Sequence, residues 1–168
     1  MNPDQLLRLA GAAAVAGGAA RVFSAFPLLS DPTTLQWLYT AIDVLLLFGL
    51  IGIYLARASR LAMLGLASFA VSVAALSFIG GPDADVFGFS TYEQGATTLA
   101  IGMVGLSIAW VRVGERPFGP PLCWFGSVLA AGLLSRLPAP APDYAFMAAG
   151  VLFGAGFVWA GWTLLRRT

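Results

Sequence analysis

Long runs of apolar residues, separated by short polar turns, alternate along the whole chain. A helix needs about 20 apolar residues to cross a bilayer. Segments close to that length cover residues 6–29, 35–56, 61–80, 92–113, 120–137 and 144–165. Turn-forming stretches such as "SDPTT", "GGPDAD" and "GERPFGPP" lie between them. The pattern predicts an all-α integral membrane protein, in which residues 1–168 form a single six-helix transmembrane bundle with short loops.

Composition supports a membrane location. Hydrophobic residues make up 59% of the chain and charged residues 10%, whereas soluble domains carry about 25% charged residues. The formal net charge of +1 gives the chain no electrostatic attraction to nucleic acid. We therefore expect membrane lipid as its surroundings and no nucleic-acid partner. Abundant Ala, Gly, Arg and Pro with no Lys are typical of a GC-rich bacterial genome, which indicates a bacterial plasma (inner) membrane.

The arginines are distributed unevenly between the two sets of helix ends. Only Arg136 marks one set, whereas the other set carries Arg8, Arg57, Arg60, Arg112, Arg116, Arg166 and Arg167. Because short cytoplasmic loops hold the excess of positive residues, this distribution predicts that both termini are cytoplasmic.

The first segment has an alternative interpretation as a cleaved signal peptide. Its stretch "LAGAAAVAGGAA" precedes Arg21, so cleavage after Ala20 fits the small-residue pattern of such sites. The preceding "MNPDQLLR" carries little positive charge, and the apolar region is rich in Ala and Gly rather than Leu. We expect this segment to be retained as a membrane helix.

Asp43 places a carboxylate inside the second apolar segment, where charge is costly and usually has a partner or a task. At 1.5 Å rise per residue, Asp43 lies about 12 Å from the outer boundary. Arg21 in the first segment lies at about 9 Å by the same measure. The matched depths on adjacent antiparallel helices predict an Arg21–Asp43 ion pair, and the alternative is a protonated Asp43 beside an Arg21 that extends outward to water.

Further polar residues gather in the same outer half of the predicted bundle. Tyr39 and Thr40 share a helical face with Asp43, while Glu93 and Arg136 lie near the outer ends of the fourth and fifth segments. The candidate cluster therefore consists of Arg21, Tyr39, Thr40, Asp43, Glu93 and Arg136. It is either an outward-open pocket for a ligand or lipid headgroup, or an ion-pair network that fixes helix register. The sequence favours the network, because Glu93 and Arg136 can lie in interfacial water.

Glycines are spaced for close helix approach. Gly150 and Gly154 form a GxxxG pair on the sixth segment, which allows internal packing or a homo-oligomer or partner membrane protein at that face. Gly11, Gly65 and Gly126 begin the odd-numbered segments at similar depth. This weak pattern leaves open an origin in three repeated hairpins.

The sequence lacks the residues that most intramembrane and soluble chemistries need. There is no His and a single Cys123, and no hydrolase, phosphate-binding or metalloprotease motif is present. We expect no metal, no cofactor and no catalysis, and predict a structural, accessory or ligand-binding membrane protein. One alternative is a transporter of small solutes or lipids that acts as a homo-oligomer, with Asp43 and Glu93 as coupling carboxylates. Another is an intramembrane enzyme that uses the same pair as acid and base.

Overall fold

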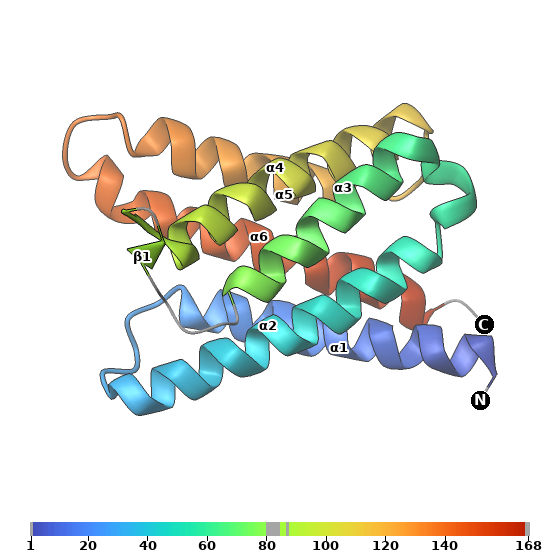
Figure 1. Ribbon diagram of the computed structural model, residues 1–168, viewed down its shortest axis with the longest axis horizontal. Coiled ribbons are helices and arrows are strands. Elements are labelled where there is room, and N and C mark those ends of the chain that lie inside the picture. The colour runs from blue at the N-terminus through green and yellow to red at the C-terminus, as the bar shows by residue number, and fades with distance from the viewer. Residues whose placement is uncertain (1, 80–84, 87, 167–168) are drawn as a thin grey trace.

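The computed structural model describes residues 2–79, 85–86 and 88–166 and forms a bundle of six helices (Figure 1). Five of them are long and apolar enough to cross a membrane. These are α1 (Pro3–Ser24), α2 (Pro32–Leu55), α3 (Ala58–Ile79), α4 (Thr91–Arg112) and α6 (Ala141–Leu165). The chain is thus a multi-span helical membrane protein by helix length and hydropathy.

The fifth helix is shorter than the predicted span 120–137. Helix α5 (Gly119–Leu129) has 11 residues and continues into a five-residue π-helical turn (Ala130–Leu134). A helix of this combined length reaches about 24 Å at 1.5 Å per residue, below the roughly 30 Å of a hydrocarbon core. Prolines at 138 and 140 follow the turn, and their missing N–H groups and fixed φ prevent continuation of the helix.

A small hairpin precedes α4 and was not predicted by the helical pattern. Strands β1 (Asp85–Val86) and β2 (Phe89–Ser90) pair antiparallel, with Val86 opposite Phe89. Gly88 turns between them at φ +80°, a conformation that glycine adopts without steric cost. Two residues per strand are too few to produce an alternating pattern in the sequence.

Polar side chains cap the first turns of three helices. Asn2 and Gln5 form a capping box at α1, and Ser90 accepts a hydrogen bond from the backbone N–H of Glu93 at α4. Asp31 accepts from the backbone N–H of Thr34 at 2.7 Å and from its hydroxyl at 2.5 Å. These hydrogen bonds lower the pKa of Asp31, because they stabilise the carboxylate form.

Helix α1 packs between α2 and α6, and α3 packs against α4. The α1–α6 contact is a glycine interface: a Cβ placed on Gly18 would lie 2.6 Å from the carbonyl oxygen of Gly154, and one on Gly161 would lie 2.6 Å from that of Gly11. The two helices run antiparallel, so the start of α1 and the end of α6 lie at the same end of the bundle (Figure 1). We call this end, which also holds Arg57 and Arg112, the arginine-rich end.

Large side chains fill the half of the bundle nearest the arginine-rich end. Trp110, Trp124 and Phe157 are fully buried, with ring centroids 5.9 Å apart for the tryptophans and 5.3 Å for Trp124 and Phe157. Leu50 and Leu106 complete this core. The other half is packed differently, because it surrounds a cavity.

Candidate functional site

A cavity of about 1100 Å³ lies in the half of the bundle away from the arginine-rich end. Residues from all six helices line it, and its polar and apolar lining residues come mainly from different helices. The polar wall is formed by α1 and α2, through Arg21, Ser24, Gln36, Tyr39, Thr40 and Asp43. The opposite walls, from α3, α4, α5 and α6, are mainly apolar. The cavity is therefore amphipathic.

Arg21 approaches the cavity from the end of α1, and its guanidinium group lies against α6. Its Nη1 donates to Oγ of Ser24 at 3.2 Å, and that hydroxyl donates to the Arg21 carbonyl oxygen at 3.0 Å. A Cβ placed on Gly150 would lie 3.6 Å from Nη2 of Arg21. The guanidinium group of Arg21 therefore lies within van der Waals reach of the Gly150 position on α6.

Asp43 lines the same cavity from α2 and is half-buried. Among the described residues, none donates a hydrogen bond to its carboxylate, and no ion pair of 4.0 Å or less joins it to Arg21. Arg21 acts on Asp43 electrostatically from a longer distance. The predicted direct ion pair is therefore not formed, because Arg21 is directed toward Ser24 and Gly150.

The structure brings together four of the six residues of the candidate cluster. Arg21, Tyr39, Thr40 and Asp43 line the cavity. Glu93 and Arg136 are exposed and do not line it. Glu93 lies in the first turn of α4, and Arg136 follows the π-helical turn. The two carboxylates proposed to act together, Asp43 and Glu93, consequently do not share the cavity.

Apolar side chains form the rest of the cavity surface and close its inner end. Leu99, Phe146 and Phe153 lie on its walls, while Leu46 and Met103 lie at its inner end and are at most 2% exposed. Beyond them, buried hydroxyls are bonded within their own helices, as for Ser107, which donates to the Met103 carbonyl oxygen at 2.7 Å. The described residues thus provide no polar path from the cavity to the arginine-rich end.

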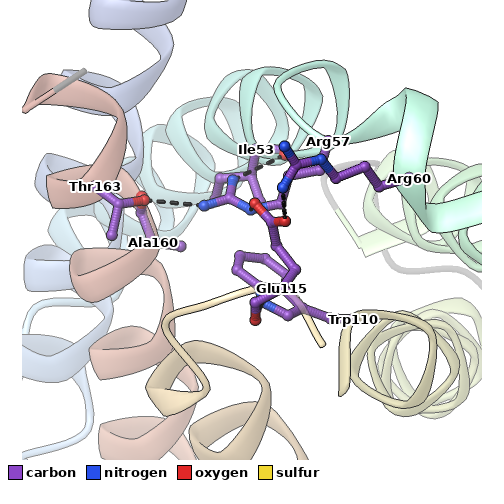
Figure 2. Close-up of polar contacts among 7 residues, drawn as sticks. All are labelled: Ile53, Arg57, Arg60, Trp110, Glu115, Ala160 and Thr163. Atoms are coloured by element: carbon purple, nitrogen blue, oxygen red, sulfur yellow. Dashed lines mark hydrogen bonds and ion pairs between the residues drawn. The ribbon is translucent and has the colours of Figure 1, made fainter. Parts of the chain in front are cut away.

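A second polar cluster, which the sequence analysis missed, surrounds Arg57 at the arginine-rich end (Figure 2). Arg57 lies between α2 and α3 and is 1% exposed. Its Nη1 donates to the Ile53 carbonyl oxygen at 3.2 Å, and its Nη2 donates to Oγ1 of Thr163 on α6 at 3.0 Å. Its Cζ lies 4.0 Å from the ring centroid of Trp110. One side chain therefore connects α2, α4 and α6.

Glu115, between α4 and α5, supplies the negative charge of this cluster. Its Oε1 lies 3.9 Å from Nε of Arg57, its Oε2 accepts from Nη1 of Arg60, and its backbone carbonyl accepts from Nε1 of Trp110 at 2.8 Å. Glu115 is 7% exposed. The sequence predicts ion pairs in the other half of the bundle, whereas the described ion pairs lie here.

The sequence did contain a signal for this cluster. Arg57 follows the buried residues Leu46, Leu50 and Ile53 at helical spacing, so it continues the buried face of α2. The sequence analysis counted Arg57 among the arginines of short loops, and a loop arginine is expected to lie in solvent. Glu115 is one of few acids at an end rich in arginine, which was the second available signal.

No group of three or more His, Cys, Asp or Glu side chains that could hold a metal ion occurs among the described residues. The expectation of no metal stays a prediction. Gly150 and Gly154 both face α1 within the chain, with a Cβ on Gly154 only 2.5 Å from the Gly18 carbonyl oxygen. These two glycines thus serve packing within the chain, and an interface with a second copy or a partner membrane protein stays a prediction.

Comparison of this chain with known protein families, with curated proteins and with solved structures found no match. The function must therefore be argued from the cavity and the Arg57 cluster themselves.

Proposed function

We propose that the protein is a non-catalytic membrane protein that binds an amphipathic ligand or lipid in the cavity between its helices. The cavity carries this proposal: its volume of about 1100 Å³ lies just above the range of roughly 300–1,000 Å³ that is typical of ligand pockets. A purely structural bundle would fill this half as densely as it fills the half around Trp110 and Trp124.

The charges in the cavity support binding rather than catalysis. Ionisable residues within a membrane span are costly, and they commonly mark ligand or ion sites. Among the described residues, Asp43 supplies the carboxylate of the cavity lining, and Glu93 lies outside it. An acid and base pair needs two groups within reach of one substrate, so this separation argues against the enzymatic alternative.

The membrane setting belongs to the same proposal. We place the protein in a bacterial plasma membrane with both termini in the cytoplasm, on the basis of the arginine distribution. The cavity would then lie in the outer half of the bilayer, and the Arg57 cluster at the cytoplasmic surface.

Transport is the second candidate function, and one observation favours it. The cavity lies in one half, while the Arg57–Glu115 cluster and the tryptophan core close the other. A transporter, acting alone or as a homo-oligomer, would have to open that cluster during its cycle. Asp43 would then act as the coupling carboxylate without Glu93.

A ligand screen with a cavity-filling variant tests the binding proposal. Ala100 lines the cavity, whereas Ala41 on α2 is exposed outside it. Lipids should raise the melting temperature of the delipidated wild-type protein and of Ala41→Trp. They should have much less effect on Ala100→Trp, because the indole occupies the ligand volume. Equal lipid effects on both variants would overturn the proposal.

A further inference from the structure

Arg21 and Asp43 place opposite charges on one wall of the cavity without direct contact. Both are half-buried and both line the same space, yet no ion pair of 4.0 Å or less joins them. Two separated, opposite charges that face one cavity form a complement to a molecule with two opposite charges of its own.

The Arg21 side suits an anionic group. A guanidinium group has five N–H donors in a planar arrangement that matches phosphate and carboxylate oxygens. Among the described residues, Ser24 is the hydrogen-bond acceptor for this group, through Nη1. The guanidinium group lies beside Gly150, and both residues line the cavity.

The Asp43 side suits an ammonium group. Its carboxylate receives no hydrogen bond from the described residues. Tyr39 and Thr40 lie one turn before it on α2 and also line the cavity, so an aromatic ring and a hydroxyl lie on the same helical face. A carboxylate beside an aromatic ring is a favourable setting for a cation.

The apolar walls indicate that the charged head of the ligand carries a hydrocarbon part. Leu99, Met103, Phe146 and Phe153 line the side of the cavity away from α1 and α2. A small polar zwitterion would leave this surface uncovered, whereas an acyl chain would cover it and remove it from water.

We propose that the ligand is a zwitterionic amphiphile, with its anionic group at Arg21, its ammonium group at Asp43 and its hydrocarbon part against α4 and α6. The inference rests on the proposed binding function and adds the class of ligand. An aminophospholipid of the membrane has this chemistry, and so does the free headgroup that lacks the chains.

A headgroup series tests the inference on the full-length protein. Delipidated protein in detergent is titrated with phosphatidylethanolamine, with phosphatidylglycerol and with diacylglycerol of the same chains, and bound lipid is counted by native mass spectrometry. The wild-type protein should bind phosphatidylethanolamine about tenfold more tightly than phosphatidylglycerol, and bind diacylglycerol most weakly. Equal affinities for the first two lipids would overturn the inference without any variant.

Variants of Asp43 and Arg21 test which charged group of the ligand each residue binds. Asp43→Asn should reduce the affinity for phosphatidylethanolamine to that for phosphatidylglycerol, and Arg21→Gln should weaken the binding of both. Glu93→Gln and Arg136→Gln are matched controls, since these exposed residues lie outside the cavity lining, and they should keep the wild-type preference. A preference that survives Asp43→Asn would contradict the assignment.

Two further measurements distinguish a wrong ligand class from a wrong binding function, and a lipid ligand from a soluble one. If Ala100→Trp abolishes lipid binding but the headgroup preference is absent, the binding function stands and the ligand class is wrong. If Ala100→Trp binds every lipid as the wild type does, the binding function itself is wrong. Competition by free phosphoethanolamine at concentrations similar to those of the lipid would identify a soluble zwitterion as the ligand, and its failure to compete would identify the lipid.

Discussion

The Nε atom of Arg57 lies 3.9 Å from Oε1 of Glu115, and both side chains are almost completely removed from solvent. Glu115 also accepts a hydrogen bond from Arg60, while the guanidinium group of Arg57 lies over the Trp110 ring. The cluster therefore fastens the connection between α2 and α3 to the connection between α4 and α5. A charge buried this deeply is stabilised by its partners, so loss of Glu115 removes the carboxylate that compensates Arg57, whereas loss of Arg57 leaves Glu115 with Arg60.

Replacing one member of this pair should destabilise the protein strongly. Glu115→Gln should lower the free energy of unfolding by about 3–5 kcal/mol, because it removes the carboxylate beside the buried Arg57 charge. Arg57→Met should lower it by less, since Glu115 keeps Arg60 as a partner. The double variant should lose less than the sum, with a coupling energy above about 1 kcal/mol. Unfolding in a series of detergent mixtures measures these values. Arg112→Gln, at an exposed arginine on the same end, should change stability by less than about 0.5 kcal/mol, and additive losses at Arg57 and Glu115 would contradict coupling.

Ala62 interrupts α3 just after this cluster, and its replacement by glycine should stabilise the fold. Its φ of 52° and ψ of −162° lie in a region that is almost exclusive to glycine, with a cost of about 1–3 kcal/mol for other residues. Ala62→Gly should therefore raise the free energy of unfolding by about 1 kcal/mol. Ala67→Gly, at an exposed position farther along the same helix, should lower it by about 1 kcal/mol. Equal losses in both variants would show that the backbone at Ala62 is unstrained.

Hydropathy predicted the helices well because each long span must satisfy its backbone internally and present apolar side chains to lipid. The segment 35–56 corresponds closely to α2 (Pro32–Leu55), and 92–113 to α4 (Thr91–Arg112). The fifth span was overestimated, since it was extended through Ser135 and Arg136 to Leu137, whereas the helical structure ends at Leu134. Hydropathy reports what lipid tolerates, and backbone hydrogen bonds decide where a helix stops.

The candidate site was predicted in part, because depth can be calculated from sequence but direction cannot. The helical rise placed Arg21 and Asp43 in the same layer, and both line the cavity. Their partners depend on how the helices rotate and pack. Arg21 lies over Gly150, a residue of α6, and no count of residues along α1 reveals that contact. Arg57 was missed because an arginine at a helix end can be solvated or buried, and the packing that decides between the two cannot be read from the sequence.

Close packing of α1 against α6 gives glycine substitutions a sharp prediction. A Cβ on Gly18 would lie 2.6 Å from the Gly154 carbonyl oxygen, a contact with backbone that cannot move aside easily. Gly18→Ala should therefore destabilise the protein by about 1–3 kcal/mol. Gly126→Ala on α5 meets only an ordinary contact of 3.6 Å and should be neutral or slightly stabilising. If both variants unfold at the same denaturant concentration, this glycine interface does not hold the two helices together.

The protein should carry no steady ion current after reconstitution into planar bilayers. Leu46 at the inner end of the cavity, and Leu50 and Leu106 in the core, are at most 2% exposed. Such a packed apolar layer leaves no room for hydrated ions. Current recordings at both polarities measure this directly. Channel openings that disappear in Asp43→Asn would contradict it and would reveal a continuous path through the cavity.

The arginine distribution predicts one orientation, and cysteine labelling in whole cells measures it. Cys123→Ala provides a background without other thiols, because the sequence has a single cysteine. Ser30 is exposed between α1 and α2, and Val113 is exposed just after α4 at the arginine-rich end. A membrane-impermeant maleimide should label Ser30→Cys in intact cells and Val113→Cys only after permeabilisation. The physical reason is that short loops with excess arginine stay in the cytoplasm. The reverse pattern would place the cavity on the cytoplasmic side, and labelling of both variants in intact cells would mean that the chain inserts in two orientations.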